Sequence, residues 1–291
     1  MIVLGSFYQI VGSTELPTNN ITKPTIDQAN NLFTTGQGYI YDLNGNLIED
    51  AQGRSFTFNG DDKQTVVRDL SILAPPQDPD ANVIGRYFYD GSGARVKKVT
   101  NTETTVFVYD AGGALAAEYS TQTPAADPTT SYLTTDHLGS PRVITDADGV
   151  ATARRDFRPF VAEPGVGGGG RTESLKYSSR GSERVRQRFT GYEKDDETGL
   201  DFAEARMYQN KHGRFTAPDP FLASARAVNP QTLNRYIYTS NNPVNFVDPL
   251  GLMWVRNRSG SIRWEDDDYK LGDGETDVTN SYQECKSDGC G

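Results

Sequence analysis

The sequence predicts a mainly β protein made of short hairpins. Gly (29 residues), Tyr (15) and Phe (13) are plentiful in this chain of 291 residues, and Leu- and Ala-rich helical stretches are nearly absent. Aromatic residues favour strands, and Gly favours the turns that join them. A segment of the form Tyr-Asp-x-x-Gly, flanked by alternating apolar residues, also recurs along the chain. Together these observations favour many short strands over a helical fold.

The charge of the chain limits the functions that it can have. The formal net charge is −10 at pH 7, which argues against a protein that binds nucleic acid through its phosphates. No stretch approaches the ~20 apolar residues of a membrane-spanning helix. The apolar N-terminus lacks the Lys or Arg with which a signal peptide begins. We therefore expect no nucleic-acid partner, no membrane span and no signal peptide.

Residues 1–37 form a polar, irregular leader to which the sequence assigns no function, and a hairpin region follows over residues 38–160. Copies of the Tyr-Asp plan lie at 38–50, 86–100 and 105–120, with a degenerate copy at 54–67 in which Phe58-Asn59 replaces Tyr-Asp. Asp and Asn readily start turns, and Gly accepts a positive φ. Each copy therefore predicts a β-hairpin whose turn begins at the Asp or Asn.

The tyrosines of these copies are expected to pack between neighbouring strands. Alternation with a period of two places Tyr41, Tyr89 and Tyr109 on one face, and a single hairpin cannot bury such a face alone. The copies must therefore stack side by side. The alternative is that the aromatic face binds a sugar. We favour packing, because aromatic residues are common cross-strand partners.

Residues 131–150 predict one further strand, turn and strand. His137 has no second His or Cys at ligand spacing, so we expect it to anchor a turn or to be solvated rather than to bind a metal or act as a base. Asp146, Asp148 and Gly149 resemble part of a calcium loop but lack its closing Glu. A hairpin turn explains them better.

Residues 161–188 predict a flexible linker. Five of the six residues 165–170 are Gly, and such a stretch forms a coil rather than a packed element. It lacks the Gly-Lys-Ser/Thr ending of a phosphate-binding loop. The linker also carries a basic cluster, which we expect to be solvated or docked on an acidic neighbour. The cluster consists of Arg180, Arg184, Arg186 and Arg188.

Motifs in the second half of the chain carry a family resemblance. They are the Arg206–Pro220 block with its Gly-Arg-Phe and Asp-Pro, Leu-Asn-Arg-Tyr at 233–236, Asn-Asn-Pro-Val-Asn-Phe-Val-Asp-Pro-Leu-Gly-Leu at 241–252, Asp-His-Leu-Gly-Ser at 136–140, and a Phe-Thr-Gly-Tyr-Glu to Thr-Gly-Leu run at 189–200. In this order they resemble the core domain of rearrangement-hotspot (Rhs) and YD-repeat proteins, including the C component of insecticidal toxin complexes.

The resemblance implies an architecture. The hairpins would form part of a spiral β-shell, residues 189–252 would form the RHS repeat-associated core, and residues 253–291 would form a short variable tail. A member of this family is normally far longer, so we expect this chain to be a portion of a larger protein.

The resemblance also implies a self-cleaving aspartyl protease. By this resemblance the residues that carry the chemistry are Arg206, Asp219 and Asp248. The scissile bond would join Leu252 to Met253. Taken alone, each Asp-Pro pair would instead be a turn signal, because Asp caps a turn and Pro fixes φ.

The reaction needs these residue types. Two neighbouring carboxylates share a proton, so the ionised one activates water, and the protonated one donates to the carbonyl of Leu252 and later to the leaving amine. Arg206 would hold one carboxylate or stabilise negative charge. Gly251, which lacks Cβ, would let the backbone bend close to the carboxylates. The substrate is tethered, so a single turnover needs no binding step, and we expect no cofactor and no metal.

The tail would be the variable effector that cleavage releases. A chain near 40 residues rarely folds alone without disulfides or metal. Cys285 and Cys290 supply two ligands at most, which do not make a zinc site. The sequence therefore assigns the tail no activity of its own.

The resemblance thus implies the core module of a bacterial polymorphic toxin that cuts itself once in cis. Its own tail would be the substrate, and further partners would be the rest of a longer Rhs shell or a cognate immunity protein. By the family resemblance its location would be secreted or at the cell surface. Two alternatives remain open: a non-enzymatic YD-repeat scaffold with carbohydrate contacts, and a degenerate Rhs fragment.

Overall fold

The computed structural model describes residues 24–75, 77–113, 115–121, 130–161, 163–164, 166–167, 169–177, 185–220, 233–248 and 251, together with three short strands of the tail. These residues form antiparallel strands and short 3₁₀ turns, and this part of the chain includes no α-helix. The prediction of a mainly β fold is confirmed. The closure of the hairpins into a spiral shell stays a prediction.

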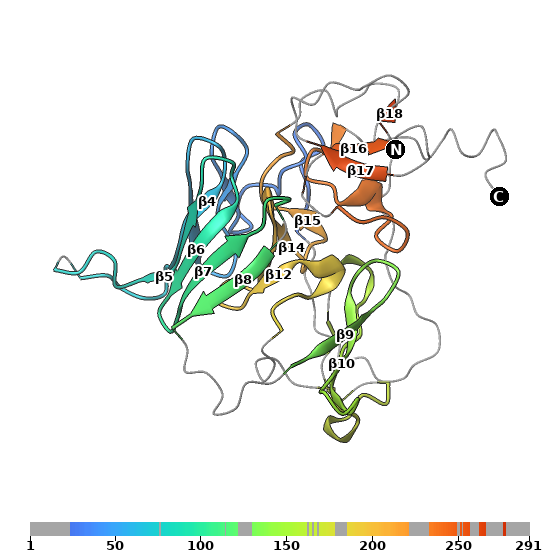
Figure 1. Ribbon diagram of the computed structural model, residues 1–291. Coiled ribbons are helices and arrows are strands. Elements are labelled where there is room, and N and C mark those ends of the chain that lie inside the picture. The colour runs from blue at the N-terminus through green and yellow to red at the C-terminus, as the bar shows by residue number, and fades with distance from the viewer. Residues whose placement is uncertain are drawn as a thin grey trace.

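An eight-stranded antiparallel sheet, here called the meander, carries the Tyr-Asp repeats. Its strands follow chain order, so each pairs with the next. They are β1 (Ile40–Tyr41), β2 (Leu47–Glu49), β3 (Arg54–Phe58), β4 (Gln64–Asp69), β5 (Val83–Tyr89), β6 (Arg95–Thr100), β7 (Thr104–Tyr109) and β8 (Leu115–Ser120). Figure 1 shows them as the blue and green layer. Each predicted repeat contributes one hairpin to it.

The hairpin turns share one five-residue loop. In the loop that begins at Asp90, the N–H of Asp90 donates to the carbonyl of Ala94, and Oδ1 of Asp90 accepts from the N–H groups of Ser92 and Ala94 at 2.9 and 3.0 Å. Gly93 has φ +85°, a conformation that Gly adopts without strain. Loops with the same backbone hydrogen bonds begin at Asp42, Asp50, Asn59, Asp136 and Asp146. The predicted turn chemistry is confirmed.

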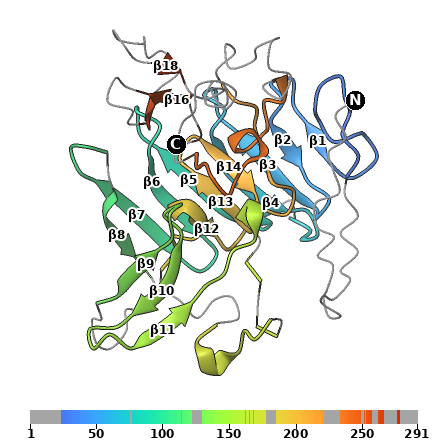
Figure 2. The same cartoon turned by 90° about the vertical axis from the view of Figure 1, so that its right-hand side faces the viewer.

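A four-stranded antiparallel sheet lies over one face of the meander (Figure 2). It consists of β12 (Glu193–Asp195), β13 (Leu200–Ala203), β14 (Arg206–Gln209) and β15 (Arg214–Phe215). Every side chain of β13 and β14 is buried. This is possible because alternate residues of the two strands face two different hydrophobic clusters.

The first hydrophobic cluster fills the space between the two sheets. The meander supplies Leu47, Phe56, Val67 and Tyr87, and the four-stranded sheet supplies Leu200, Phe202 and Met207. Residues of the predicted hairpin region and of the predicted core region therefore share one hydrophobic core. The boundaries at 37, 160, 188 and 252 stay predictions of sequence organisation.

The second hydrophobic cluster covers the opposite face of the four-stranded sheet. It consists of Phe189, Tyr192, Ala203, Tyr208, Phe215 and Tyr238. A three-stranded sheet of β9 (Tyr132–Thr135), β10 (Pro141–Thr145) and β11 (Ala151–Arg154) contributes Leu138, from its first turn, to the edge of this cluster. The turn at Asp146 joins β10 to β11, which confirms a hairpin there.

The repeat tyrosines pack as predicted. Tyr41 and Tyr89 lie against the first hydrophobic cluster. The hydroxyl of Tyr89 donates to the carbonyl of Gln64 in β4 at 2.8 Å, and that of Tyr109 donates to the carbonyl of Arg95 in β6 at 2.9 Å. Tyr89 and Tyr109 are therefore each bonded to a neighbouring strand through their hydroxyls. This arrangement favours cross-strand packing over a sugar-binding face.

Three strands of the tail are described by their backbone. β16 (Met253–Arg256) pairs with β17 (Ile262–Glu265) and β18 (Thr276–Asp277) in a separate antiparallel sheet. Cys285 and Cys290 lie outside the described residues. Within the described part of the chain, no helix has the length and apolar character that crossing a membrane requires.

Candidate active site

Arg206 and Asp248 meet inside the protein. Arg206 begins β14, and its Nη2 lies 3.3 Å from Oδ2 of Asp248; the two side chains are 4% and 6% exposed. The guanidinium also lies 3.7 Å from the ring centroid of Phe215. The carboxylate balances the charge of the buried Arg206, and the ring of Phe215 gives its guanidinium plane a surface on which to stack. The sequence predicted both members of this pair as site residues.

Asp248 also closes a tight bend. Its Oδ1 accepts a hydrogen bond from the N–H of Gly251, and Gly251 has φ +68°. A Cβ at Gly251 would lie 3.0 Å from the carbonyl oxygen of Ala203 and 3.4 Å from Nε of Arg206. The position thus requires Gly for its φ and for the close approach to the Arg206 side chain. This bend brings Gly251, the residue before Leu252, to the buried carboxylate of Asp248.

Asp219 is joined to this pair through Arg235. The carbonyl of Arg235 accepts from the N–H of Asp219 at 2.8 Å and from Nη1 of Arg206 at 3.3 Å. Nη2 of Arg235 donates in turn to the carbonyl of Asp219. The backbone at Asp219 and the side chain of Arg206 therefore share one acceptor. Arg235, which the sequence did not single out, is the link between them.

The proposed scissile bond lies at the limit of the described chain. Leu252 is outside the described residues, and Met253 is the first residue of β16, where it pairs with Glu265. The assignment of Leu252 and Met253 as the cleavage position stays a proposal.

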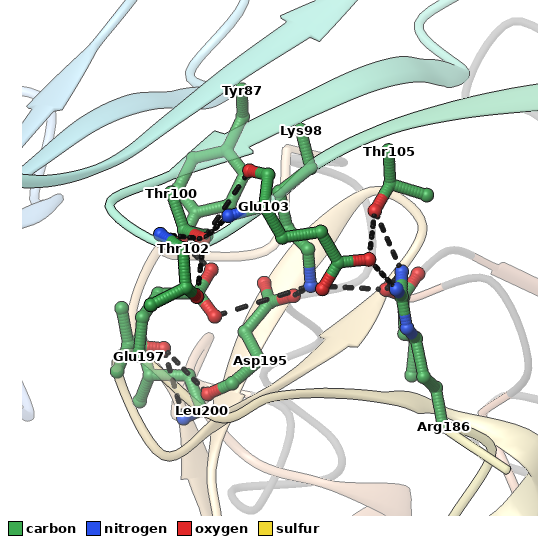
Figure 3. Close-up of polar contacts among 12 residues, drawn as sticks. Tyr87, Lys98, Thr100, Thr102, Glu103, Thr105, Arg186, Asp195, Glu197 and Leu200 are labelled. Atoms are coloured by element: carbon green, nitrogen blue, oxygen red, sulfur yellow. Dashed lines mark hydrogen bonds and ion pairs between the residues drawn. The ribbon is translucent and has the colours of Figure 1, made fainter. Parts of the chain in front are cut away.

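A buried group of charged residues, here called the interlayer ion cluster, joins the two sheets. It consists of Arg95 and Lys98 of β6 with Glu193, Asp195 and Glu197 of the facing segment. Figure 3 labels Lys98, Asp195 and Glu197 of this cluster. Arg95 lies 2.7 Å from both Asp195 and Glu193, and Lys98 lies 2.9 Å from Asp195. The side chains of Arg95 and Asp195 have no exposed surface. No pattern in the sequence indicated this cluster.

Aromatic rings surround the guanidinium of Arg95. Its central carbon lies 3.8 Å from the ring centroid of Phe202 and 5.3 to 5.4 Å from those of Phe107 and Tyr87. Although burial opposes ionisation, the charges of Arg95 and Lys98 lower the pKa of Asp195. Cations and carboxylates in this dry site therefore stabilise each other.

The basic cluster of the predicted linker is docked and not solvated where it is described. Arg186 forms an ion pair with Glu103 and lies 3.5 Å from Glu118, and its side chain is 20% exposed. Arg188 lies 3.8 Å from Glu163. For these two residues the solvated alternative is wrong, because Arg186 faces Glu103, which precedes β7, and Glu118 of β8, and Arg188 faces Glu163. Arg180 and Arg184 lie outside the described residues.

The remaining candidate ligands carry no metal site. Nε2 of His137 lies 2.9 Å from the carbonyl oxygen of Val244, so His137 anchors its turn to the core segment as expected. Burial lowers the pKa of His212 to about 4, and its Nε2 lies 2.7 Å from the hydroxyl of Tyr39. Among the described residues, no group of three His, Cys, Asp or Glu could hold a metal ion.

The pKa of Glu197 offers a test of the interlayer ion cluster. Burial and then the charge of Asp195 raise this pKa from 4.5 to about 7, so the folded protein holds a proton that the unfolded chain loses near pH 4.5. The resulting stability is present below pH 4.5 and is lost as the pH rises to 7. It amounts to about 3 kcal/mol at most, at 1.36 kcal/mol per unit.

Between pH 5 and pH 8, the free energy of unfolding is therefore expected to fall less in Glu197→Gln than in the unchanged chain. Gln stays neutral at both values, so the variant should be the more stable protein at pH 8. Urea unfolding at the two values measures this difference. Glu193→Gln is the matched control and should destabilise instead, because Glu193 lies 2.7 Å from Arg95 and 3.2 Å from Lys98. An unchanged pH dependence in Glu197→Gln would contradict the assignment.

Comparison with known proteins gives both sequence relatives and structural neighbours. No protein-family model matches the chain. The chain is 30% identical over 230 residues to tRNA3(Ser)-specific nuclease WapA of Bacillus spizizenii and 30% identical over 237 residues to tRNA nuclease WapA of Bacillus subtilis. It is 26% identical over 264 residues to double-stranded DNA deaminase toxin A of Burkholderia cenocepacia. Each match covers 74% of this chain, but only 9% of each WapA protein and 17% of the deaminase toxin.

The structural neighbours are large toxin assemblies. The crystal structure of TcdB2-TccC3-TEV matches with a TM-score of 0.53 at 19% identity, over 73% of this chain and 11% of that chain. The Photorhabdus luminescens Tc holotoxin pore matches with a TM-score of 0.52 at 18% identity, over 73% and 10%. At such identities the likeness shows the fold alone. The chain spans about a tenth of the length of these neighbours.

Proposed function

Since the sequence relatives support a place for this chain in the Rhs-type toxin family, we propose that it is a segment of such a toxin that cuts itself between Leu252 and Met253. The meander would form part of the toxin's shell, and cleavage would release the chain that follows Leu252. The relatives' own activities, on tRNA or double-stranded DNA, belong to proteins of which this chain spans a small share. We assign neither activity to the tail.

The single observation that supports cleavage is the arrangement of Arg206, Asp248 and Gly251. A buried carboxylate is held by a buried Arg, and its second oxygen accepts the N–H of the residue that precedes Leu252. The enzyme group and the substrate peptide are thus ordered by the same few contacts. An intramolecular reaction gains effective concentrations on the order of 10⁵ M or more from such placement.

The proposed reaction uses the two aspartates in different roles. The cation of Arg206 stabilises negative charge on Asp248, so we assign Asp248 the role of base that takes a proton from the attacking water. Asp219 would donate its proton to the carbonyl oxygen of Leu252. The tetrahedral intermediate then breaks its C–N bond: the nitrogen of Met253 leaves as an amine with the proton that Asp248 took from the water, and a hydroxyl of the intermediate returns a proton to Asp219. The products are a chain that ends at Leu252 and a tail that begins at Met253.

The partners and the location follow from the same proposal. The tail would be the substrate in cis, the rest of a longer shell would enclose it, and a cognate immunity protein would bind the released product. A toxin of this kind acts outside the cell that makes it, so we propose a secreted or cell-surface location.

The intact mass of freshly made protein tests the proposal. We expect a fragment that ends at Leu252 and a second fragment whose N-terminal sequence is Met253-Trp254-Val255. A fragment that begins at Pro249 would instead indicate acid hydrolysis of the labile Asp248-Pro249 bond. Protein that keeps its full mass at neutral pH would leave the scaffold, in which Asp248 and Gly251 serve only as a structural turn, as the better description.

A further inference from the structure

The two proposed catalytic aspartates share a feature that the cleavage chemistry does not use. Each precedes a proline, and the main-chain carbonyl of each accepts a hydrogen bond from a side chain of another segment. The hydroxyl of Tyr192 donates to the carbonyl of Asp248, and Nη2 of Arg235 donates to the carbonyl of Asp219. The same kind of contact thus occurs at both Asp-Pro pairs.

An Asp-Pro segment needs such a donor. The residue before Pro is kept in extended conformations, and Pro has no N–H with which to continue a backbone ladder. A buried carbonyl needs a hydrogen-bond donor, and at both Asp residues a side chain supplies it. A side-chain donor from a packed element also fixes the direction of the peptide plane. This in turn fixes where the Asp carboxylate points.

Tyr192 is a rigid donor. It is 3% exposed and belongs to the second hydrophobic cluster. Its ring centroid lies 6.3 Å from that of Tyr208 and 6.4 Å from that of Tyr238. A ring packed in this way cannot move without disturbing its neighbours, so its hydroxyl holds the carbonyl of Asp248 in one place.

Arg235 holds Asp219 from two sides. Its side chain donates to the Asp219 carbonyl, and its own carbonyl accepts the Asp219 N–H at 2.8 Å. The same carbonyl accepts from Nη1 of Arg206 at 3.3 Å. Arg235 therefore sets the place of Asp219 relative to Arg206, which is paired with Asp248.

We propose that Tyr192 and Arg235 are positioning residues, which fix the two Asp-Pro segments by their carbonyls and so hold the two carboxylates at the separation that the reaction needs. This inference rests on the proposed self-cleavage. Neither side chain is asked to touch the scissile bond or to exchange a proton. Their effect on the rate would come only through the geometry of Asp248 and Asp219.

A time course of cleavage after cell-free synthesis tests the proposal. Tyr192→Phe keeps the ring and removes the donor, and Arg235→Gln removes the guanidinium. Each is expected to slow cleavage roughly ten- to a hundredfold, the size of effect that a misplacement of about 1 Å produces. Arg235→Lys restores one donor and should cleave faster than Arg235→Gln.

Two controls separate positioning from stability. The hydroxyl of Tyr208 is buried in the same cluster and has no hydrogen-bond partner among the described residues, so Tyr208→Phe should cleave at the unchanged rate. Val67 is fully buried in the first cluster, and Val67→Ala should lower the melting temperature without slowing cleavage. The inference is overturned if Tyr192→Phe and Arg235→Gln cleave at the unchanged rate, or if their cleavage slows no more than that of Val67→Ala.

Hydrogen exchange gives a readout that does not need cleavage. In full-length Asp219→Asn protein, adding Tyr192→Phe should speed exchange of the Gly251 amide, which donates to Asp248, whereas adding Tyr208→Phe should not. Failure of the unchanged chain to cleave would remove the proposed function, but not this test of how Asp248 is held. Unchanged exchange at Gly251 in the Tyr192→Phe protein would overturn the positioning role of Tyr192.

Discussion

Asp195→Asn is expected to lower the free energy of unfolding by about 3–5 kcal/mol, the usual cost of removing one partner from a buried ion pair. Asp195 has no exposed side-chain surface and contacts Arg95 at 2.7 Å and Lys98 at 2.9 Å. Asn keeps one acceptor oxygen but removes the charge. Where Glu197 is neutral, the two cations would then face Glu193 alone among the carboxylates of the cluster, in a largely buried site.

Glu197 is expected to compensate for part of this loss. The charge of Asp195 is one cause of its raised pKa, after burial, so that pKa should fall when residue 195 is neutral. At pH values above this pKa, Glu197 is ionised and can balance the charge of Lys98, which lies 3.9 Å away. The loss caused by Asp195→Asn should therefore be larger at pH 5 than at pH 8. When both proteins also carry Glu197→Gln, the loss caused by Asp195→Asn should be the same at the two pH values.

Urea unfolding at both pH values measures these effects. Asp80→Asn is the matched control. Asp80 also contacts two arginines, at 2.9 Å from Arg68 and 2.6 Å from Arg86, but its side chain is 53% exposed. Exposed ion pairs contribute little, so this variant should unfold like the unchanged chain. Equal losses for Asp80→Asn and Asp195→Asn would mean that burial does not decide the contribution of the interlayer ion cluster.

The hairpins could be predicted from the sequence because their determinants are local. An Asp and a Gly three residues apart, such as Asp90 and Gly93, specify the same loop in each hairpin where they occur, since the Asp side chain accepts hydrogen bonds from backbone N–H groups of its own loop. Even Asn59, in the degenerate copy, forms this loop. No contact with the rest of the chain is needed to make the turn.

The interlayer ion cluster could not be predicted in the same way. Arg95 and Lys98 are three residues apart, so strict alternation along a strand would place them on opposite faces. A register shift in the pairing of β5 with β6, between Phe88 and Tyr89, lies opposite Arg95, and both cations face the four-stranded sheet. Their partner Asp195 is about a hundred residues away. Such a contact depends on how the two sheets pack.

The candidate site lies between these cases. The Asp-Pro pairs and Gly251 are visible as turn signals, and the contact between Arg206 and Asp248 agrees with the implied site. Arg235 belongs to the Leu-Asn-Arg-Tyr motif, but its role as a link depends on the main-chain positions of three segments, which the motif does not indicate. Tyr192 similarly belongs to the Phe-Thr-Gly-Tyr-Glu motif, but the hydrogen bond from its hydroxyl to Asp248 depends on the fold.

Asp219→Asn and Asp248→Asn are each expected to stop cleavage between Leu252 and Met253 almost completely. A positioned acid or base contributes about 10²- to 10⁴-fold, and neither variant can sustain a proton shared between two carboxylates. Asn at 248 still has an oxygen that can accept the Gly251 N–H. Loss of cleavage with the bend retained would therefore report on the charge and not on the turn.

The double variant decides whether the two aspartates act as one unit. If they share a proton, Asp219→Asn with Asp248→Asn should cleave no more slowly than either single variant, because residues that act together are not additive. Arg206→Lys should also fail to restore the rate, since lysine lacks the planar fork that reaches both Asp248 and the carbonyl of Arg235. Asp90→Asn, which alters an Asp in an exposed hairpin turn, should cleave normally. Multiplicative losses in the double variant would assign the aspartates separate roles, and full cleavage in both single variants would exclude them as the catalytic pair.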